Sequence, residues 1–369
     1  MVAQWDSTQV LPNKNLTWAT IEKWNLGFDY GFLGGRLGGS IDFYKGKTTD
    51  MLMDRSVPYP SGFRNAYDNL GEVSNKGIEI TLNTVNIDGD GKDKFRWTSN
   101  IVFDLNRNEI KSLFGKNYMG EEADDVANAV AYGFDSYYAL MKGHSITSAY
   151  DLKKIGIFQS QSEIDSYVDK NGNKIQPNAV PGDLKFEDYN GDGKIDANDR
   201  HWIGDMDPLF TVNFGNTLEW KNFSLYFNFR WMQGSDTHFL GFDPNAFDTS
   251  SMGGGAQLDA VEPWTEQNHS TEYARYGYNN ENNYLYWNSR SFLKLKDLVF
   301  SYNFDQKLIN RLGLSSLKAY VAGTDLFTIT GWSGLDPEDG GTIAAGSASS
   351  RYGSPGTFKT VSFGLNLSF

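Results

Sequence analysis

The chain has no cysteine, which excludes disulfide bonds and thiolate metal sites in any redox compartment. Positive charge is also scarce: 46 Asp and Glu outnumber 33 Lys and Arg, and the net charge of −13 argues against a nucleic-acid partner. No stretch approaches the ~18 apolar residues of a transmembrane helix. The first ten residues, "MVAQWDSTQV", lack the basic start and apolar core of a signal peptide, so we expect none there.

Aromatic residues and glycine are abundant instead. Phe, Tyr and Trp make up 15% of the 369 residues, and 39 residues are Gly. Aromatic side chains fit a pleated surface, and strong helix formers are used sparingly. The composition therefore favours an all-β fold.

Apolar and polar residues alternate in segment after segment, with the period of a β-strand. In residues 210–220, for example, Val212 and Phe214 point to one face while Thr211 and Asn213 point to the other. The pattern predicts about nine or ten strands, each with one apolar face. It recurs in residues 24–32, 37–43, 78–82, 95–103, 223–231, 298–304, 317–321 and 361–369.

A soluble β-sandwich would alternate in the same way, but three features favour a transmembrane barrel. The strands reach the ~9–11 residues that a tilted strand needs to cross a bilayer. Aromatic residues flank the apolar stripes, as they do at membrane interfaces. Short or moderate connections also alternate with long ones, as in an antiparallel up-and-down outer-membrane barrel with extracellular long loops. The shorter connections are 33–36, 88–93, 221–222 and 305–315, and the long ones are 53–74, 106–207, 232–286 and 331–356.

About nine strands do not make a complete barrel of the usual kind. Single-chain bacterial barrels normally have an even number of strands. An open sheet edge in lipid would leave backbone groups unpaired, at a cost of several kcal/mol each. We therefore expect residues 1–369 to be the C-terminal part of a larger barrel.

Residues 188–199, "DYNGDGKIDAND", have the spacing of an EF-hand calcium loop, with Gly193 at the sharp turn. Pro181 and Pro208 exclude long flanking helices, so we expect a structural calcium site that staples the connection 106–207, not a sensor. The alternative is an acidic turn that matches the spacing by chance. The expected ligands are Asp188, Asn190, Asp192, the backbone carbonyl of Lys194, Asp196 and Asp199.

Many segments, in order from about residue 15 to the end, resemble the C-terminal part of the SusC/RagA-type TonB-dependent outer-membrane transporters. The calcium loop stands where members of this family carry the same loop. The segments that carry the resemblance include "WNLGFDYGFLGGRLGGSIDFYKGKTTDML", "NLGEVSNKGIEI", "PGDLKFEDYNGDGKIDANDR", "SFLKLKDLVFSYNF", "LGLSSLKAYVAGTDLFTITGWSGLDPE" and "VSFGLNLSF".

The resemblance implies a 22-stranded barrel in the outer membrane of a Gram-negative bacterium. An N-terminal domain plugs such a barrel, a SusD-like surface lipoprotein closes it from outside, and TonB supplies energy through the plug. The cargo is typically an oligosaccharide or a peptide. The plug and the N-terminal barrel strands are absent from this chain, so we expect it to supply only part of the barrel.

Cargo contacts are harder to identify. The loop 232–286 is rich in aromatic residues, and Trp264 and Tyr276 could stack on sugars; loop packing or contact with the lipoprotein is the interpretation we favour. Polar-face residues such as Arg230 could line a cargo path or touch the plug. We take Trp264, Tyr276 and Arg230 as the candidate cargo-binding residues.

Two other functions stay open. A calcium-stapled glycan-binding or adhesin surface module would need a self-contained soluble fold, with its apolar faces buried between two layers. An outer-membrane enzyme is disfavoured because no catalytic set is recognisable: the "GKT" at 46–48 lacks the first glycine of a phosphate-binding loop. The four histidines, His144, His201, His238 and His269, show no metal-binding spacing.

Overall fold

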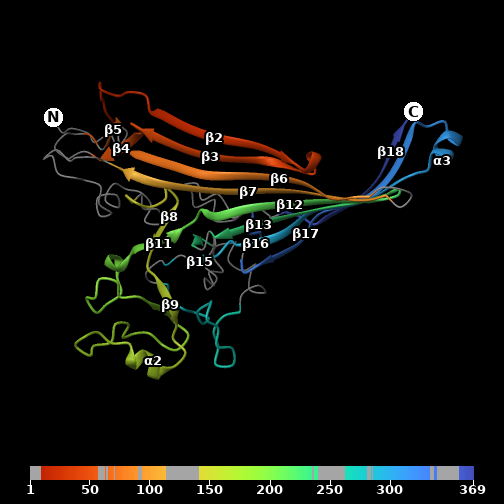
Figure 1. Ribbon diagram of the computed structural model, residues 1–369. Helices are drawn as coiled ribbons and strands as arrows, with labels where there is room; N and C mark the ends of the chain where they lie inside the picture. Colours follow the sequence, from red (N-terminus) through yellow and green to blue (C-terminus); the bar gives the residue numbers. More distant parts are fainter. Residues whose placement is uncertain are drawn as a thin grey trace, which may run out of the picture.

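The central element of the computed structural model is one antiparallel sheet in which nine strands of the described residues follow each other in chain order (Figure 1). This is the predicted up-and-down arrangement. The structure describes residues 10–56, 63, 65–69, 71–89, 94–113, 141–234, 237–239, 262–280, 284, 286–332, 336–338 and 357–369. The strands are β2 (Thr20–Phe32), β3 (Leu37–Thr49), β6 (Glu72–Asp88), β7 (Phe95–Ser112), β12 (Pro208–Trp220), β13 (Phe223–Gly234), β16 (Phe292–Asn303), β17 (Ser316–Thr330) and β18 (Thr360–Ser368).

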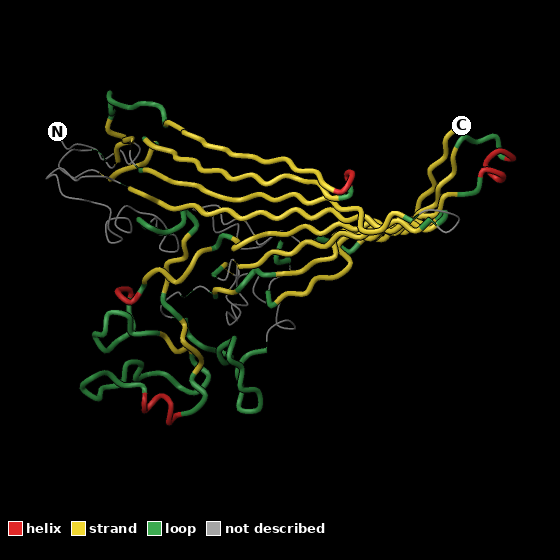
Figure 2. The backbone as a smooth tube through the Cα atoms, in the orientation of Figure 1, coloured by secondary structure: helices red, strands yellow, loops and turns green. Residues whose placement is uncertain are grey.

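Smaller elements lie before β2 and in the connections, and those of the long connections gather at one end of the sheet, as Figure 2 shows. None of the helices among the described residues is long and apolar enough to span a membrane. The small strands are β1 (Val10–Leu11), β4 (Leu52–Ser56), β5 (Asn65–Asn69), β8 (Ser148–Asp151), β9 (Lys154–Ile157), β10 (Leu184–Phe186), β11 (His201–Asp205), β14 (His238–Phe239) and β15 (Trp287–Asn288). The helices are η1 (Leu33–Gly35), α2 (Gln161–Ser166), η3 (Ala197–Asp199) and α3 (Gln306–Arg311).

The strand β7 is longer than the alternation indicated. The strand continues to Ser112. The connection to β12 was expected to begin at residue 106, and it begins after Ser112 instead. Residues 106–112 read "NRNEIKS", with polar groups on both faces. Alternation is lost where a strand leaves the membrane, because water then bathes both faces and neither must be apolar. The backbone ladder with β6 nevertheless continues there.

The register of the sheet sorts the side chains into apolar and polar rows that cross the strands. Within a row, residues are direct partners on neighbouring strands and point to the same face. One apolar row contains Phe28, Ile41, Ile80, Phe103, Val212, Trp231, Leu293 and Ile329. The adjacent row, on the opposite face, contains Asp29, Ser40, Thr81, Val102, Asn213, Arg230, Lys294 and Thr328.

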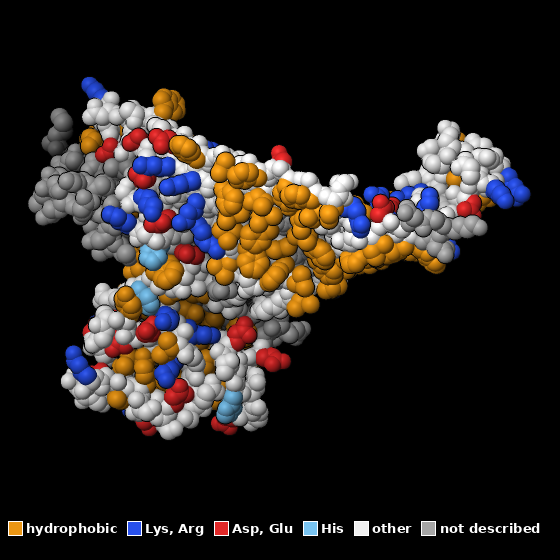
Figure 3. Space-filling view, in the orientation of Figure 1, with side chains coloured by type: hydrophobic (Ala, Val, Ile, Leu, Met, Phe, Trp, Pro, Cys, Tyr) orange, Lys and Arg blue, Asp and Glu red, His pale blue; other side chains and the backbone are white. Residues whose placement is uncertain are grey.

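The apolar face of the sheet is open rather than packed. Phe28 is 56% exposed, Trp231 42% and Ile329 63%. Figure 3 shows the corresponding hydrophobic belt running across the strands. In a sandwich these side chains would be buried under a second sheet. An exposed belt of this extent is instead the surface that a barrel presents to hydrocarbon.

Polar residues interrupt the apolar face in the row that contains Thr84, Ser99 and Asn216. Asn216 has only 1% of its surface exposed, although it lies on the outward face. Its Oδ1 accepts hydrogen bonds from the Trp97 indole nitrogen at 2.9 Å and from the Ser99 hydroxyl at 2.7 Å. Neighbouring side chains thus shield the amide, which would be costly to expose to lipid.

The two faces make a direct prediction. Ile101 faces the belt and Asn100 the polar side, and the two are adjacent on β7. We expect Ile101→Lys to lower the free energy of unfolding in lipid bilayers by about 2–4 kcal/mol, because the ammonium enters hydrocarbon. Asn100→Lys is the matched control and should change it far less. Equal effects of the two substitutions would contradict the assignment of the faces.

Candidate functional site

The predicted calcium loop joins β10 to β11 and is built around the carboxylate of Asp188. Its Oδ1 accepts hydrogen bonds from the backbone N–H groups of Gly191 at 2.9 Å and Asp192 at 3.2 Å, and Oδ2 accepts one from Gly193 at 2.9 Å. Gly191 and Gly193 have φ of 72° and 89°, a region that favours glycine. The tight turn expected at Gly193 is therefore present.

The last residue of the loop, Asp199, closes it onto its start. The residue is fully buried. Its Oδ1 accepts from the N–H groups of Tyr189 at 3.0 Å and Asn190 at 3.3 Å, and its Oδ2 accepts from Asp196 at 2.8 Å. One carboxylate thus holds both ends of the turn together. The flanking elements are the short strands β10 and β11 and the single turn η3, so neither side carries a helix of the length found in sensor loops.

A lysine ammonium balances the remaining acidic groups of the loop. Lys194 Nζ contacts Asp196 and lies 3.6 Å from Asp192 Oδ2, and its hydrogen bond lowers the pKa of the Asp196 carboxyl. Among the residues with described positions, no three His, Asp or Glu side chains are already arranged as metal ligands. The acidic and amide oxygens fit a hard cation in kind, and Asp196 would have to exchange Lys194 for the ion.

The end of the predicted calcium loop is tied through Asp151 to the connection between β13 and β16. Arg200 Nε lies 3.3 Å from Asp151 Oδ1, and Asp151 is fully buried. The other carboxylate oxygen of Asp151 accepts a hydrogen bond from the Trp287 indole nitrogen at 2.9 Å. Trp287 belongs to β15, which pairs with β14. A single carboxylate therefore couples the connection before β12 to the connection after β13.

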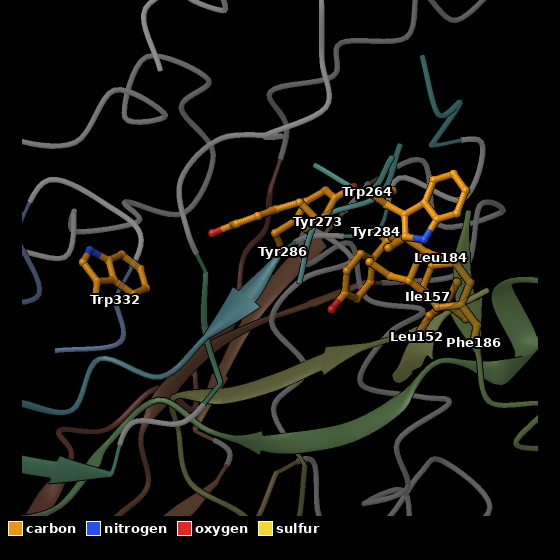
Figure 4. Close-up of a cluster of buried hydrophobic side chains, with 10 residues drawn as sticks. Leu152, Ile157, Leu184, Phe186, Trp264, Tyr273, Tyr284, Tyr286 and Trp332 are labelled. Carbon is orange, nitrogen blue, oxygen red and sulfur yellow. The ribbon is translucent and has the colours of Figure 1, made fainter. Parts of the chain in front are cut away.

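The candidate cargo residue Trp264 lies in an aromatic core formed by the long connections, as Figure 4 shows. It is 8% exposed, and its indole nitrogen donates to Gln159 Oε1 at 2.8 Å. This position supports the loop-packing interpretation. Tyr276, in contrast, is 49% exposed. The core consists of Leu152, Ile157, Leu184, Phe186, Trp264, Tyr273, Ala274, Tyr284, Tyr286 and Trp332.

A buried ionic cluster on the polar face of the sheet was not predicted from the sequence. Lys294 is 1% exposed, and its Nζ lies 2.8 Å from Asp336 Oδ1 and 3.0 Å from Glu338 Oε2. Lys296 also contacts Glu338, at 3.0 Å. The third cation is the candidate cargo residue Arg230, whose Nη1 lies 3.0 Å from Glu338 Oε1. The cluster fastens residues 336–338 to β13 and β16.

Strand geometry explains how this cluster forms. Arg230 and Lys294 are direct partners on β13 and β16. The register shifts between Leu295 and Asp297, so Lys296 sits in a bulge, where a side chain can be re-aimed. Burial alone would raise the pKa of Asp336, but hydrogen bonds from Lys294 and from Thr357 outweigh it and lower the pKa to about 2. Asp336 is therefore ionised at neutral pH, as the pair requires.

Removing the central cation should destabilise the protein. Lys294→Met removes the buried ammonium that pairs with the carboxylates of Asp336 and Glu338. We expect it to lower the free energy of unfolding in detergent micelles by about 3 kcal/mol. Lys307→Met, which removes an exposed lysine of α3, is the control. The double variant Lys294→Met/Asp336→Leu should recover part of the loss, since it removes both charges. An unaltered stability of Lys294→Met would refute the importance of the cluster.

Comparisons with known proteins agree with the fold. Residues 3–139 match the family described as "TonB dependent receptor-like, beta-barrel". The chain is 30% identical over 368 residues to TonB-dependent receptor P3 of Formosa agariphila, covering 97% of this chain and 35% of that protein. It is 28% identical over 372 residues to TonB-dependent receptor SusC of Bacteroides thetaiotaomicron, covering 97% of this chain and 32% of that protein.

Solved structures point to the same architecture. The structure of the RagAB peptide transporter superposes with a TM-score of 0.68 at 23% identity, covering 98% of this chain and 36% of that one. The chain thus spans about a third of the length of the relatives that it matches. The resemblance to the SusC/RagA-type TonB-dependent transporters is confirmed, and the family model of the TonB-dependent receptor β-barrel matches residues 3–139.

Proposed function

We propose that this chain supplies part of the barrel wall of a TonB-dependent importer that carries a large nutrient, an oligosaccharide or a peptide, across the outer membrane of a Gram-negative bacterium. The observation that carries the proposal is the sheet itself, with an exposed apolar belt on one face and polar rows on the other. Such a wall separates hydrocarbon from an aqueous interior. The relatives are named receptors and transporters, which fits transport rather than catalysis.

The edges of the sheet support the need for further barrel strands. Within the described residues, β2 and β18 each pair with a strand of the sheet on one side only. In lipid, each unpaired N–H or C=O group along such an edge would cost several kcal/mol. The remaining barrel strands would pair with these two edges. A plug inside the closed barrel would connect it to TonB.

The long connections support a partner on the outer side. They fold into a lobe at one end of the strands, with a core of its own. A SusD-like surface lipoprotein would cover this lobe, and the loops would then be extracellular. The relatives named SusC and RagAB are the basis for a partner of this kind.

Among the three candidate cargo residues, Arg230 and Tyr276 are the more accessible. Arg230 lies on the polar face, and its side chain is 39% exposed. A cargo hydroxyl or carbonyl oxygen could accept a hydrogen bond from the exposed part of its guanidinium group. Trp264 already fills the loop core, so its contribution would be to hold the loop that presents Tyr276.

Uptake measurements test the transport proposal. Cells that produce the intact receptor should accumulate a labelled oligosaccharide or peptide, and loss of TonB should abolish the accumulation. Cells with the receptor gene deleted are the control. Uptake that persists without TonB would contradict the proposal. If this chain, produced without detergent, were a monodisperse soluble monomer, an adhesin or glycan-binding surface module would be favoured instead.

We also propose that the loop 188–199 binds a structural calcium ion. Asp188, Asn190, Asp192, Asp196 and Asp199 would contribute side-chain oxygens, and Lys194 its backbone carbonyl. The turn at Gly193 and the closure by Asp199 support the proposal, because they hold the ends of the loop as an oxygen cage requires. The ion would supply charge neutralisation and would stiffen the link between β10 and β11.

Terbium luminescence offers a readout that does not depend on transport. Tb³⁺ commonly replaces Ca²⁺, and the ring of Tyr189 within the loop would sensitise its emission. We expect emission that calcium displaces, and an affinity at least tenfold lower in Asp188→Asn and Asp192→Asn, which each remove a charged ligand. Asp165→Asn, on α2 outside the loop, should bind normally. Emission that is unaffected by either loop substitution would refute the site.

A further inference from the structure

The outward face of β2, β3, β6 and β7 changes from apolar to cationic within two residues on the long-loop side. The last apolar row there contains Leu26, Phe43, Ile78 and Leu105. Two residues further along each strand, on the same face, the next row contains Trp24, Lys45, Lys76 and Arg107. Figure 3 shows Lys and Arg side chains gathered directly beside the hydrophobic belt over these strands.

The cations of this row are available to a ligand. Lys45 and Lys76 are exposed, and neither has an ion-pair partner within 4.0 Å among the residues that the structure describes. Arg107 is held in place by the carbonyl oxygens of Asn106 at 2.6 Å, Pro208 at 3.3 Å and Leu209 at 2.8 Å. These three bonds use three of its five N–H groups, which leaves two donors on a fixed guanidinium.

The carboxylates of the neighbourhood are mostly engaged with other cations. Glu72 lies 2.9 Å from Lys47 Nζ, and Glu109 lies 2.6 Å from Lys111 Nζ. Glu22 is the direct partner of Lys47 on β3. Five cations and three carboxylates on this face leave a charge of +2, in a chain whose net charge is −13. The excess of positive charge is therefore local to the rim of the belt.

The position of the row matches the depth of lipid headgroups. Two residues of a strand advance about 7 Å, or about 5 Å along the membrane normal for a tilt of about 45°. Trp24, 80% exposed in the same row, is the residue type that marks the membrane–water interface. Neighbouring strands lie about 4.8 Å apart, so one phosphate group can contact cations on two strands at once.

We propose that Lys45, Lys76 and Arg107 form a binding site for the phosphate groups of a phosphorylated glycolipid in the leaflet on the long-loop side. The acyl chains of the lipid lie along the apolar belt below the row, and its phosphates meet the cations above it. The proposal rests on the proposed function, because it needs the belt to face a bilayer. Charge complementarity and continuity with the belt identify the occupant as a lipid and not a soluble anion.

Lipid binding to the intact receptor in detergent tests the proposal. The probes are phosphorylated lipid A, the same lipid with its phosphates removed, and inorganic phosphate alone. We expect the phosphorylated lipid to bind, the dephosphorylated lipid to bind at least tenfold more weakly, and millimolar inorganic phosphate to compete poorly. Raised salt should weaken binding of the phosphorylated lipid, because the contact is ionic.

Substitutions show whether lipid binding depends on the cations of this row or only on the total charge of the protein. Lys45→Gln/Lys76→Gln should lower the affinity for phosphorylated lipid A at least tenfold. Lys170→Gln/Lys307→Gln removes the same charge from exposed positions on α3 and in the long connection, and should leave the affinity unchanged. Both variants replace lysine by the slightly shorter, neutral glutamine, and their folding is checked by heat-dependent gel mobility.

Three results would overturn the proposal. One is equal binding of the two lipids, another is an unaltered affinity of Lys45→Gln/Lys76→Gln, and the third is full competition by inorganic phosphate, which would assign the row to a soluble anion. If the receptor enters bilayers but fails these tests, this inference alone is wrong. If it does not enter bilayers at all, the proposed function fails with it.

Discussion

Backbone hydrogen bonding in the absence of water is the constraint on which this structure depends. Hydrocarbon offers no partner to an N–H or C=O group, so the strands must satisfy each other. Between β2 and β3 the pairing continues from Thr20 to Phe32 without a register shift. With the backbone satisfied, the side chains on the lipid side are free to be apolar, and those on the other side remain polar.

The lobe of the long connections follows different rules, because water surrounds it. Its stability comes from an aromatic core and from carboxylates that each hold several partners, such as Asp151 and Asp199. The ionic cluster around Lys294 belongs to the boundary between the two regions. There a buried lysine on the barrel wall meets acidic residues of a loop, and their mutual hydrogen bonds offset the cost of desolvation.

The sequence predicts the strands of the barrel wall better than the long connections and their contacts with the wall. Alternation around Val212 and Phe214 is a local pattern that the bilayer imposes, so strand number and facing could be read from it. The end of β7 at Ser112 could not be predicted, because residues 106–112 lie outside the bilayer and need not alternate between apolar and polar side chains. The contact between Lys294 and Asp336 joins residues 42 positions apart, and no local pattern signals it. For Trp264 the sequence already favours loop packing over a sugar platform, and its burial agrees with loop packing.

Asp151 forms an ion pair with Arg200 and accepts a hydrogen bond from Trp287, and this has a consequence for chimeric receptors. Loops are the natural units to exchange between homologues, since they tolerate variation better than strands. Grafting only the segment between β7 and β12 would replace Asp151, and Trp287 would lose its acceptor. Grafting only the segment after β13 would replace Trp287, and the buried Asp151 carboxylate would lose its indole donor. The two segments therefore have to be transplanted as one unit, and recombination between related genes should preserve them together.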